Sequence, residues 1–193
     1  MIGAIRAAVA DDIPALVDLQ VASWRDAYRG LMPDGFLDGD LLANRKAFWA
    51  RKWATRHPED LILLSERPDV GVVGLVSVEV GRPHRPRAAF LDSLHVRPGL
   101  RGGGLGGKLM VAAADQLQSH EVRSLSLEVL TGNLSAIAFY RRLGGTLGPS
   151  RRVPFLEFNI NEQDVLWDDL SALVRTSGTI KARAARHHAP NTF

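Results

Sequence analysis

A glycine-rich segment, residues 96–107, lies between a strand-like run and a helical pattern. The apolar run Phe90–Val96 comes before the glycines, and Leu105–Leu117 follows them with the spacing of an amphipathic helix. Because glycine has no side chain, backbone N–H groups in such a turn can approach a ligand closely. The first turn of the following helix adds unpaired N–H donors and the positive end of its dipole. The segment therefore predicts an anion site, and we interpret the anion as a phosphate.

One reading of this segment is a dinucleotide site. Gly102-x-Gly104-x-x-Gly107 fits the fingerprint of such sites, and Glu128 stands near the distance at which their ribose-binding acid occurs. That fingerprint, however, directly follows a strand in a long series of strand–helix units. Here Pro98 separates the strand from the glycines, and too few residues remain for a doubly wound sheet. The dinucleotide interpretation is therefore disfavoured.

A second reading is the phosphate loop of nucleotide hydrolases. Gly102-x-x-x-x-Gly107-Lys108 follows that pattern up to the lysine. The next residue is Leu109, where a serine or threonine hydroxyl should hold Mg²⁺. A leucine cannot bind a metal ion, so a nucleotide-binding protein of this type is the third and least favoured functional class.

The same loop contains a third motif, Arg101-x-x-Gly104-x-Gly106, entered through Val96-x-Pro98. It resembles the acetyl-CoA signature, Q/R-x-x-G-x-G/A, of the GNAT superfamily of N-acetyltransferases. Backbone donors and one arginine suit a pyrophosphate and require no metal. The resemblance implies that the cofactor is bound by Arg101, Gly102, Gly103, Gly104, Leu105, Gly106 and Gly107.

Composition narrows the class of protein. The 193 residues suit one domain with a full core, and 46% of them are hydrophobic. Cysteine is absent, which excludes disulfides, thiolate metal sites and cysteine nucleophiles. No apolar stretch reaches membrane-spanning length, and Asp11-Asp12 ends the short apolar run at the start of the chain. We expect a cytoplasmic protein without a membrane or metal partner.

The basic charge belongs to the end of the chain. Residues 173–193 contain four of the 24 Lys+Arg and none of the 21 Asp+Glu, so the remainder carries 20 basic against 21 acidic residues. We expect a GNAT-like domain at 1–172 and a basic, disordered tail at 173–193. The tail charge is too sparse, with Phe193 its lone aromatic, to predict nucleic-acid binding. If the tail packs instead, a homodimer interface is the place we expect it.

The expected elements alternate between strands and helices. Strands are predicted at 2–7, 61–65, 70–80, 90–96, 124–130, 152–160 and 164–167, and helices at 12–24, 41–53, 105–117 and 134–143. This order matches the GNAT superfamily over about residues 2–172. The resemblance implies a mixed α/β fold with a central, mostly antiparallel, splayed seven-stranded sheet and about four flanking helices.

The strand before the glycine loop has an irregular pattern. Leu94 and Val96 keep a period of two, but Leu91 is three positions from Leu94. A β-bulge places all three on one face, whereas without it Leu91 packs on the opposite face. In the GNAT superfamily a bulge here splays two strands, so the resemblance implies that Leu94, His95 and Val96 offer backbone groups to the pantetheine arm.

The segment 131–144 is the second informative stretch. Its pattern N-x-x-A-x-x-F-Y-x-x-x-G resembles the family segment after the fifth strand. The resemblance implies that Asn133 contacts the cofactor and that the Tyr140 hydroxyl lies near the leaving sulfur. Without a ligand, the same residues are read as a helix N-cap and a core aromatic.

Acetyl transfer to an amine requires a base, an oxyanion donor and an acid. The acceptor must lose a proton before it attacks, and Asp92 on the splayed strand is the first choice as base. Glu79 is the second choice and His95 the third; a water relay from a more distant carboxylate is the alternative. Each is equally consistent with a solvent-facing strand residue. A backbone N–H near Val96 suits the oxyanion, and Tyr140 suits protonation of the thiolate.

The segment 24–33 resembles the family loop that forms a wall of the acceptor pocket. Trp24 and Tyr28, four residues apart, either line that pocket or close the end of a helix as core aromatics. The predicted function is N-acetyl transfer from acetyl-CoA, as co-substrate, to a primary amine by direct attack, with a small molecule, peptide or protein as acceptor. The alternative is a CoA-binding sensor or interaction module without catalysis.

Overall fold

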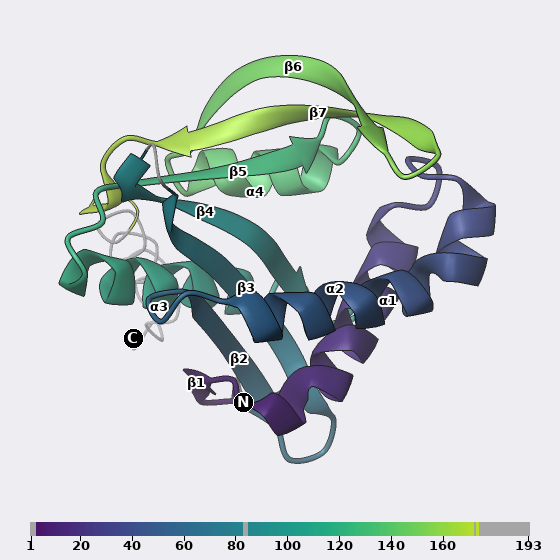
Figure 1. The fold of residues 1–193 in the computed structure, drawn as a ribbon, viewed down its shortest axis with the longest axis horizontal. Coiled ribbons are helices and arrows are strands. Elements are labelled where there is room, and N and C mark those ends of the chain that lie inside the picture. Colours follow the sequence, from purple (N-terminus) through teal and green to yellow (C-terminus); the bar gives the residue numbers. More distant parts are fainter. Residues whose placement is uncertain (1–2, 83–84, 172, 174–193) are drawn as a thin grey trace, which may run out of the picture.

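Seven strands form one sheet in the order β1-β2-β3-β4-β5-β7-β6 (Figure 1). The computed structural model describes residues 3–82, 85–171 and 173. Neighbouring strands are antiparallel except β4 and β5, which run parallel. The strands are β1 (Ile5–Ala7), β2 (Leu61–Arg67), β3 (Gly71–Arg82), β4 (Arg85–Val96), β5 (Ser124–Leu130), β6 (Thr146–Phe155) and β7 (Phe158–Trp167). The predicted splayed, mostly antiparallel seven-stranded sheet is confirmed.

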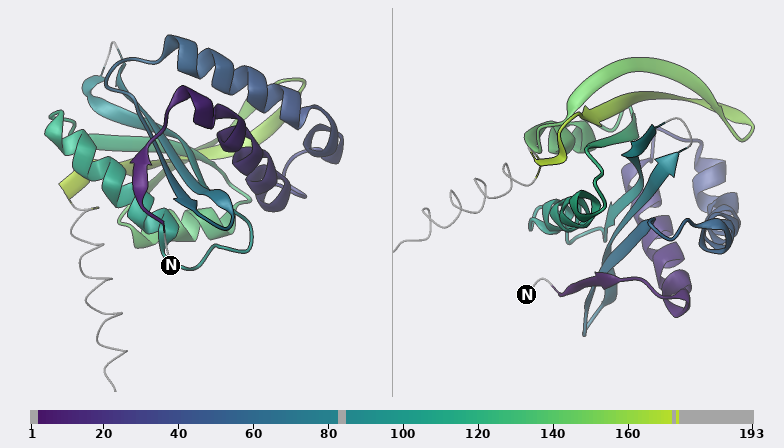
Figure 2. Two further views of the ribbon diagram at one scale, coloured as in Figure 1. Left: turned by 90° about the horizontal axis from the view of Figure 1, so that it is seen from below. Right: turned by 60° about the vertical axis from the view of Figure 1, so that its left-hand side comes forward.

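Helices cover both faces of this sheet (Figure 2). They are α1 (Ile13–Ala27), α2 (Leu41–Thr55), α3 (Leu105–Ser119) and α4 (Leu134–Arg142), with a 3₁₀ turn at Ala10–Asp12 and a π-helical turn at Phe36–Asp40. One hydrophobic cluster joins α3 and α4 to the sheet, and a second joins α1 and α2 to the opposite face. The sheet is therefore the middle of three layers, and its two faces can serve different ligands.

The buried stripe of α2 is unusual for a surface helix. Its inward residues are Leu41, Arg45, Trp49 and Lys52, spaced by four, four and three positions. This spacing places them on one helical face. Two of the four are cations, so α2 brings positive charge against the sheet.

The predicted bulge in β4 is confirmed. Ser77 of β3 pairs with Ser93, but Val78 pairs with Leu91, so Asp92 is the extra residue. Leu91, Leu94 and Val96 then face the cluster beneath α3. Ser93 and His95 instead contact Gln20 of α1. The bulge thus places Asp92 on the α1/α2 side together with Ser93.

Strands β4 and β5 separate soon after they meet. They are paired only through Ala88–Ser124, Ala89–Leu125 and Phe90–Ser126. From Leu91 onward the β5 side of β4 has no strand partner among the described residues. The gap between the strands opens toward the glycine loop, which follows β4, and toward α4, which follows β5 (Figure 1).

The last two strands differ from the prediction. The expected strands 152–160 and 164–167 are wrong, because the chain reverses at Leu156–Glu157 and pairs Phe155 with Phe158. Leu156 has φ 53°, a left-handed conformation that the turn demands and that an apolar residue does not signal. Asn159, Asn161 and Glu162, which mimic a polar loop, belong to β7.

The tip of the β6–β7 hairpin reaches the connection between α1 and α2 (Figure 1). The rings of Phe155 and Phe158 lie 5.8 and 5.6 Å from that of Phe36, and Phe155 lies 6.2 Å from Trp24. This aromatic cluster joins the far end of the sheet to α1 and to the connection between α1 and α2.

Leu170 and Leu173 are fully buried in the core beneath α3. The packed part of the chain therefore extends to the first residue of the predicted tail, whereas 174–193 lie outside the described residues. In the described part, no helix has both the length and the apolarity to cross a membrane.

Candidate active site

The glycine loop forms an N–H cradle at the start of α3. Gly102 and Gly104 have φ of +84° and +82°, a region that favours glycine. The first α-helical bond runs from Lys108 N to Gly104 O, at 3.1 Å. The preceding N–H groups, of Leu105, Gly106 and Gly107, have no acceptor within the helix. The cradle combines free donors with the positive end of the α3 dipole, as an anion site requires.

Gly106 lets α4 approach this cradle. A Cβ atom at Gly106 would lie 3.3 Å from Phe139 Cζ, so a larger residue would require the Phe139 ring to shift. The start of α3 therefore packs closely against the middle of α4.

Arg101 contacts α1. Its guanidinium forms an ion pair with Asp26 and donates to Ser23 Oγ at 3.2 Å, while Nε approaches Val96 O at 3.4 Å. Arg101 thus connects the glycine loop to α1. Asp26 offsets part of the positive charge that the sequence assigns to phosphate binding.

The backbone of β4 presents alternate residues to the gap. Arg97 N donates to Val73 O at 2.9 Å, which directs this residue toward β3. Strand alternation then turns the N–H groups of Val96 and Leu94 toward the gap and that of His95 toward β3. Of the predicted pantetheine-binding residues, Leu94 and Val96 therefore turn their N–H groups to the gap, whereas that of His95 is directed to β3.

Residues of α4 lie on the other side of the gap. Asn133 caps the helix, its Oδ1 accepting from Ala136 N at 3.2 Å. Tyr140 is buried, with its ring 6.0 Å from Trp167 in an edge-on arrangement. Burial, together with the neighbouring Tyr28, raises the pKa of the Tyr140 phenol well above its usual value. Both residues have the structural roles considered from sequence, and neither role prevents contact with a ligand.

Lys52 brings the two predicted carboxylate bases together. Its Nζ lies 3.0 Å from Glu79 Oε1 and forms an ion pair with Asp92 Oδ2. The side chain of Asp92 is 11% exposed and that of Glu79 34%. Burial raises the pKa of Asp92, and Lys52 opposes that rise. The carboxylates form one ionic cluster on the α1/α2 side of the bulge.

The third candidate base, His95, is held in a buried neutral network. Trp49 Nε1 donates to Gln20 Oε1 at 2.8 Å, which turns the Gln20 amide nitrogen toward His95 Nε2, at 3.3 Å. Nε2 must therefore accept, and Nδ1 donates to Ser23 Oγ at 3.0 Å. Burial, with Arg45 and Arg101 nearby, lowers the pKa of His95 to about 3. With its lone pair already used, His95 is a poor base.

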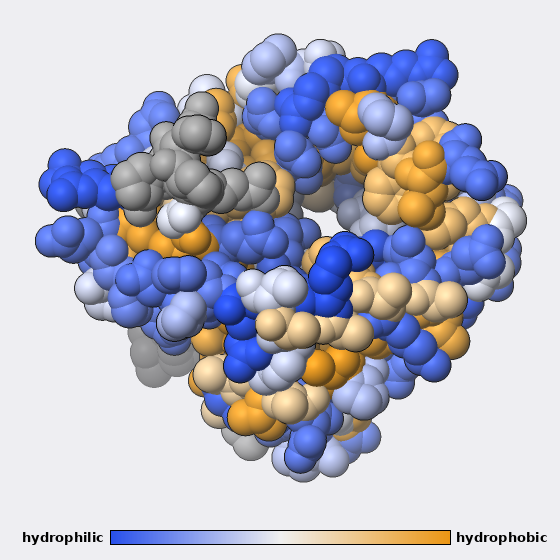
Figure 3. All heavy atoms as spheres, in the orientation of Figure 1, coloured by the Kyte–Doolittle hydropathy of each residue, from blue (hydrophilic) through white to orange (hydrophobic). Residues whose placement is uncertain are grey.

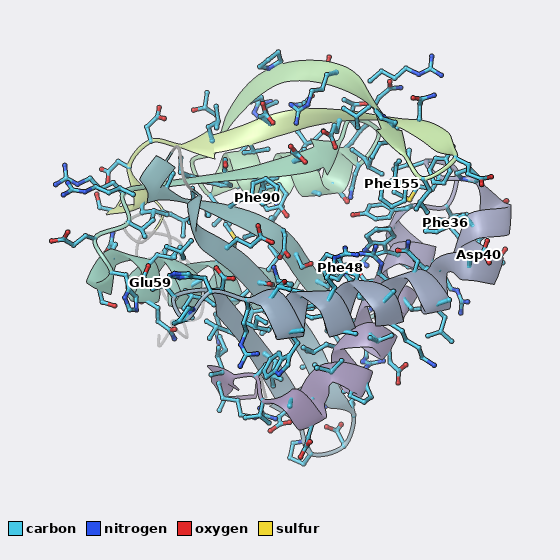
Figure 4. The ribbon with its side chains drawn as sticks, in the orientation of Figure 1. Phe36, Asp40, Phe48, Glu59, Phe90 and Phe155 are labelled. Atoms are coloured by element: carbon cyan, nitrogen blue, oxygen red, sulfur yellow. The ribbon has the colours of Figure 1, made fainter. Side chains whose placement is uncertain are left out.

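An opening passes through the middle of the face formed by these elements (Figure 3). Phe90 of β4, Phe48 of α2 and Phe155 of β6 surround it (Figure 4). We call these three rings, with Trp24 and Tyr28, the aromatic wall. Trp24 contacts Phe155, and its ring lies 5.1 Å from that of Tyr28. Trp24 belongs to the hydrophobic cluster beneath α1 and α2 and Tyr28 packs against it, so their position agrees with both alternatives, an acceptor wall and core aromatics.

Two residues of this region, Arg45 and Lys52, were not predicted from sequence. Their spacing could have indicated their burial, because they are seven residues apart, with Trp49 between them, on the buried stripe of α2. In the described part of the chain, no three metal-ligating side chains of His, Cys, Asp or Glu gather in one place.

Comparison with known proteins places this arrangement in a family. Residues 19–145 match the Acetyltransferase (GNAT) family. The chain is 30% identical over 146 residues to an uncharacterized N-acetyltransferase of Methanocaldococcus jannaschii. That alignment covers 72% of this chain and 59% of the relative, so less than two thirds of the relative's length is matched.

Solved structures share the fold at lower identity. A ribosomal-protein-alanine N-acetyltransferase from Brucella melitensis is 23% identical, with a TM-score of 0.63 over 85% of this chain and 98% of that one. The yncA protein from Salmonella typhimurium, solved with its cofactor acetyl-CoA, is 18% identical, with a TM-score of 0.64 over 88% and 94%. Because the family match covers more than half of the chain and the fold agrees with it, this chain belongs to the GNAT family of acetyltransferases.

Proposed function

We propose that this protein is an N-acetyltransferase that moves the acetyl group of acetyl-CoA to a primary amine by direct attack. The observation that carries the proposal is the β4–β5 gap. On one side it meets an anion cradle and a buried tyrosine, and on the other a carboxylate cluster and an aromatic wall. Acetyl donor and amine acceptor can therefore approach from opposite faces of the sheet and meet at the gap.

The residues present fit acetyl-CoA, which supplies the acetyl group as an activated thioester. The free N–H groups of Leu105, Gly106 and Gly107, with the loop glycines Gly102, Gly103 and Gly104, would hold the pyrophosphate. Arg101 would position this loop through its contacts with Asp26 and Ser23. Leu94 and Val96 would offer backbone groups to the pantetheine arm, and Asn133 would border it from α4.

Asp92 is the proposed base for the acceptor amine. It lies two residues beyond the last β4–β5 pair, Phe90–Ser126, beside α2, and burial brings its pKa closer to that of an amine. Glu79, half-exposed and joined to Asp92 through Lys52, would pass the proton to solvent. Lys52 remains charged: burial alone lowers the pKa of its ammonium, but the two carboxylates raise it above its ordinary value.

The Val96 N–H would stabilise negative charge on the thioester oxygen. Tyr140 would act on the leaving sulfur. Because its pKa is raised, its phenol stays protonated and is a weak acid. We therefore assign it as a hydrogen-bond donor to the developing thiolate. The phenol gives its proton to the sulfur as the thiol departs, and it recovers a proton from solvent.

Trp24 and Tyr28 would contact the acceptor, a small-molecule amine or the amine of a peptide or protein. Two neighbours in fold are named for acetylating ribosomal-protein alanine, which is one precedent for a protein amine. We expect the reaction in the cytoplasm, where acetyl-CoA is available.

Thiol release from acetyl-CoA tests the proposal. The protein is incubated with acetyl-CoA and a panel of primary amines, and free thiol is measured against an amine-free blank. Amine-dependent release with matching N-acetylated product is expected. Binding of CoA by calorimetry without release for any amine would favour a CoA-binding sensor. Absence of CoA binding would remove the cofactor assignment as well.

A further inference from the structure

Arg45 is a buried cation without an acidic partner. The residue is 7% exposed, and its guanidinium bonds to the neutral amide oxygen of Asn44, with Nε at 2.9 Å. Among residues 3–82, 85–171 and 173, no carboxylate lies within ion-pair distance of it. The closest acidic cluster, Asp92 with Glu79, is bonded to Lys52 instead.

The buried position of Arg45 has an electrostatic cost. Burial lowers its pKa to about 10, so the side chain is still charged at neutral pH. Its guanidinium carbon lies 4.3 Å from the ring centroid of Trp24 and 4.7 Å from that of Phe48. Besides these stacking contacts, Nε and Nη2 donate to Asn44, and part of the N–H edge is left without a bond among the described residues. A charged donor edge in an apolar setting favours an anion.

Trp24 provides a second, independent donor beside it. Its Nε1–H is buried and has no hydrogen-bond partner in the described structure. A buried indole N–H ordinarily finds an acceptor. The two donors come from different helices, α1 and α2, and the Arg45 guanidinium stacks on the Trp24 ring.

Both donors contact residues that border the central opening. Phe48, which stacks on Arg45, borders that opening in Figure 4. Trp24 contacts Phe155 on the opposite border and Tyr28 on its own helix. Tyr28, Asp92 and Arg51 are close enough to Arg45 to influence it electrostatically. The pair of donors therefore lies on the acceptor side, near the proposed base.

We propose that Arg45 and the Trp24 indole N–H bind a carboxylate of the acceptor, so that the acetylated substrate is an amine carrying a carboxylate, as in an amino acid. This inference rests on the proposed function and adds its substrate class. A planar guanidinium edge matches a carboxylate through two parallel hydrogen bonds. Such a site rejects the neutral amide, because the buried donors then lose their charged acceptor.

The test compares pairs of amines that differ only in this group. Amino acids and the corresponding amino acid amides are offered with acetyl-CoA, and kcat/KM is measured by thiol release for each. For at least one pair, the wild-type protein should prefer the acid. Arg45→Gln should lower the acid-to-amide ratio about 10- to 100-fold. Trp24→Phe, which keeps an aromatic ring and removes the N–H, should lower it about 2- to 10-fold.

Two further variants control for charge and folding. Lys46→Gln removes an exposed cation from the next position of α2 and should leave the ratio unchanged. Arg45→Lys keeps the charge without the planar edge and should give an intermediate ratio. Acetyl-CoA affinity and melting temperature show whether each variant is folded. If Arg45→Gln is not folded, the acid-to-amide ratios of Arg45→Lys and Trp24→Phe test the carboxylate site instead.

The outcomes separate this inference from the proposed function. Equal rates for acids and amides, or an unchanged ratio in the folded Arg45 and Trp24 variants, overturn the carboxylate site while leaving acetyl transfer intact. If no amine releases thiol, the proposed function fails. Calorimetric titration of the same amino acids into the CoA-loaded protein then decides the anion site by itself: loss of binding in Arg45→Gln supports it, and no binding to the wild type overturns it.

Discussion

Lys52 of α2 and Asp92 of the β4 bulge form an ion pair across the space between helix and sheet. The bulge is what makes this contact, because the extra residue turns Asp92 to the same face as Ser93. The bulge in β4 therefore brings the proposed base, Asp92, next to a cation, and this cation favours the ionised form of Asp92. The ion pair also fixes α2, and with it Arg45, against the sheet.

Replacing Lys52 should change the pH dependence of catalysis. A carboxylate base acts only when ionised, and Lys52 lowers the pKa of Asp92 against the effect of burial. In Lys52→Met this opposition is lost, so the pKa of Asp92 rises and activity appears at higher pH. We expect the acidic limb of kcat/KM to move up by about 1 to 3 pH units. Lys46→Met, an exposed change on the same helix, should not move it. An unmoved limb in folded Lys52→Met would place the base elsewhere.

Tyr140→Phe should slow turnover without weakening cofactor binding. The change removes one hydroxyl and keeps the ring that packs against Trp167. A hydrogen bond to a developing charge is worth about 1.5 to 3 kcal/mol, which corresponds to roughly 10- to 100-fold in kcat. The loss should increase with pH, since solvent protons for the thiolate become scarce. CoA affinity, by calorimetry, should stay the same. Full activity across the pH range would leave Tyr140 as a packing residue.

Local sequence patterns were sufficient to predict the two backbone features that border the site, the bulge in β4 and the start of α3. The spacing of Leu91, Leu94 and Val96 predicts the bulge, because only an inserted residue can put all three on one face. The glycine run predicts the start of α3 for a similar reason, since Gly104 takes a conformation that disfavours other residues. Both features depend on the backbone near the residue itself.

Features that depend on distant parts of the chain were missed. Arg45 and Lys52 carry charges that predict a solvent-facing position, and only packing against Trp24, Glu79 and Asp92 explains their burial. The partner of Arg101, Asp26, is 75 residues away in sequence. The β6–β7 turn was misplaced because Leu156 takes a left-handed conformation without being glycine, asparagine or aspartate.

Gly104→Val should abolish CoA binding while the chain stays folded. Gly99 offers a matched control, because Gly99 and Gly104 have φ of +81° and +82° and neither has an atom within 4 Å of a built Cβ. Valine at either position costs about 1 to 3 kcal/mol of backbone strain, so both variants should lose similar thermal stability. Only Gly104 caps α3 beside the free N–H groups. Calorimetry should therefore show lost affinity for Gly104→Val alone, and unchanged affinity there would contradict the phosphate cradle.

The buried imidazole of His95 should make the protein sensitive to acid. Its pKa is lowered to about 3 in the folded chain, against an ordinary value of 6.5. Between these values the unfolded chain binds a proton that the folded chain does not, so stability is lost as pH falls below 6.5, by about 1.4 kcal/mol for each pH unit. Protonation would also set Nε2–H against the Gln20 amide group. Asp92, whose pKa in the folded chain is raised, contributes with the opposite sign, so a comparison of variants is needed to isolate the effect of His95.

Urea unfolding at pH 7 and pH 5 should show a smaller difference in the free energy of unfolding for His95→Gln than for the wild type. His57→Gln, on the surface, should keep the full difference, and an equal difference in His95→Gln would mean that His95 is not held neutral.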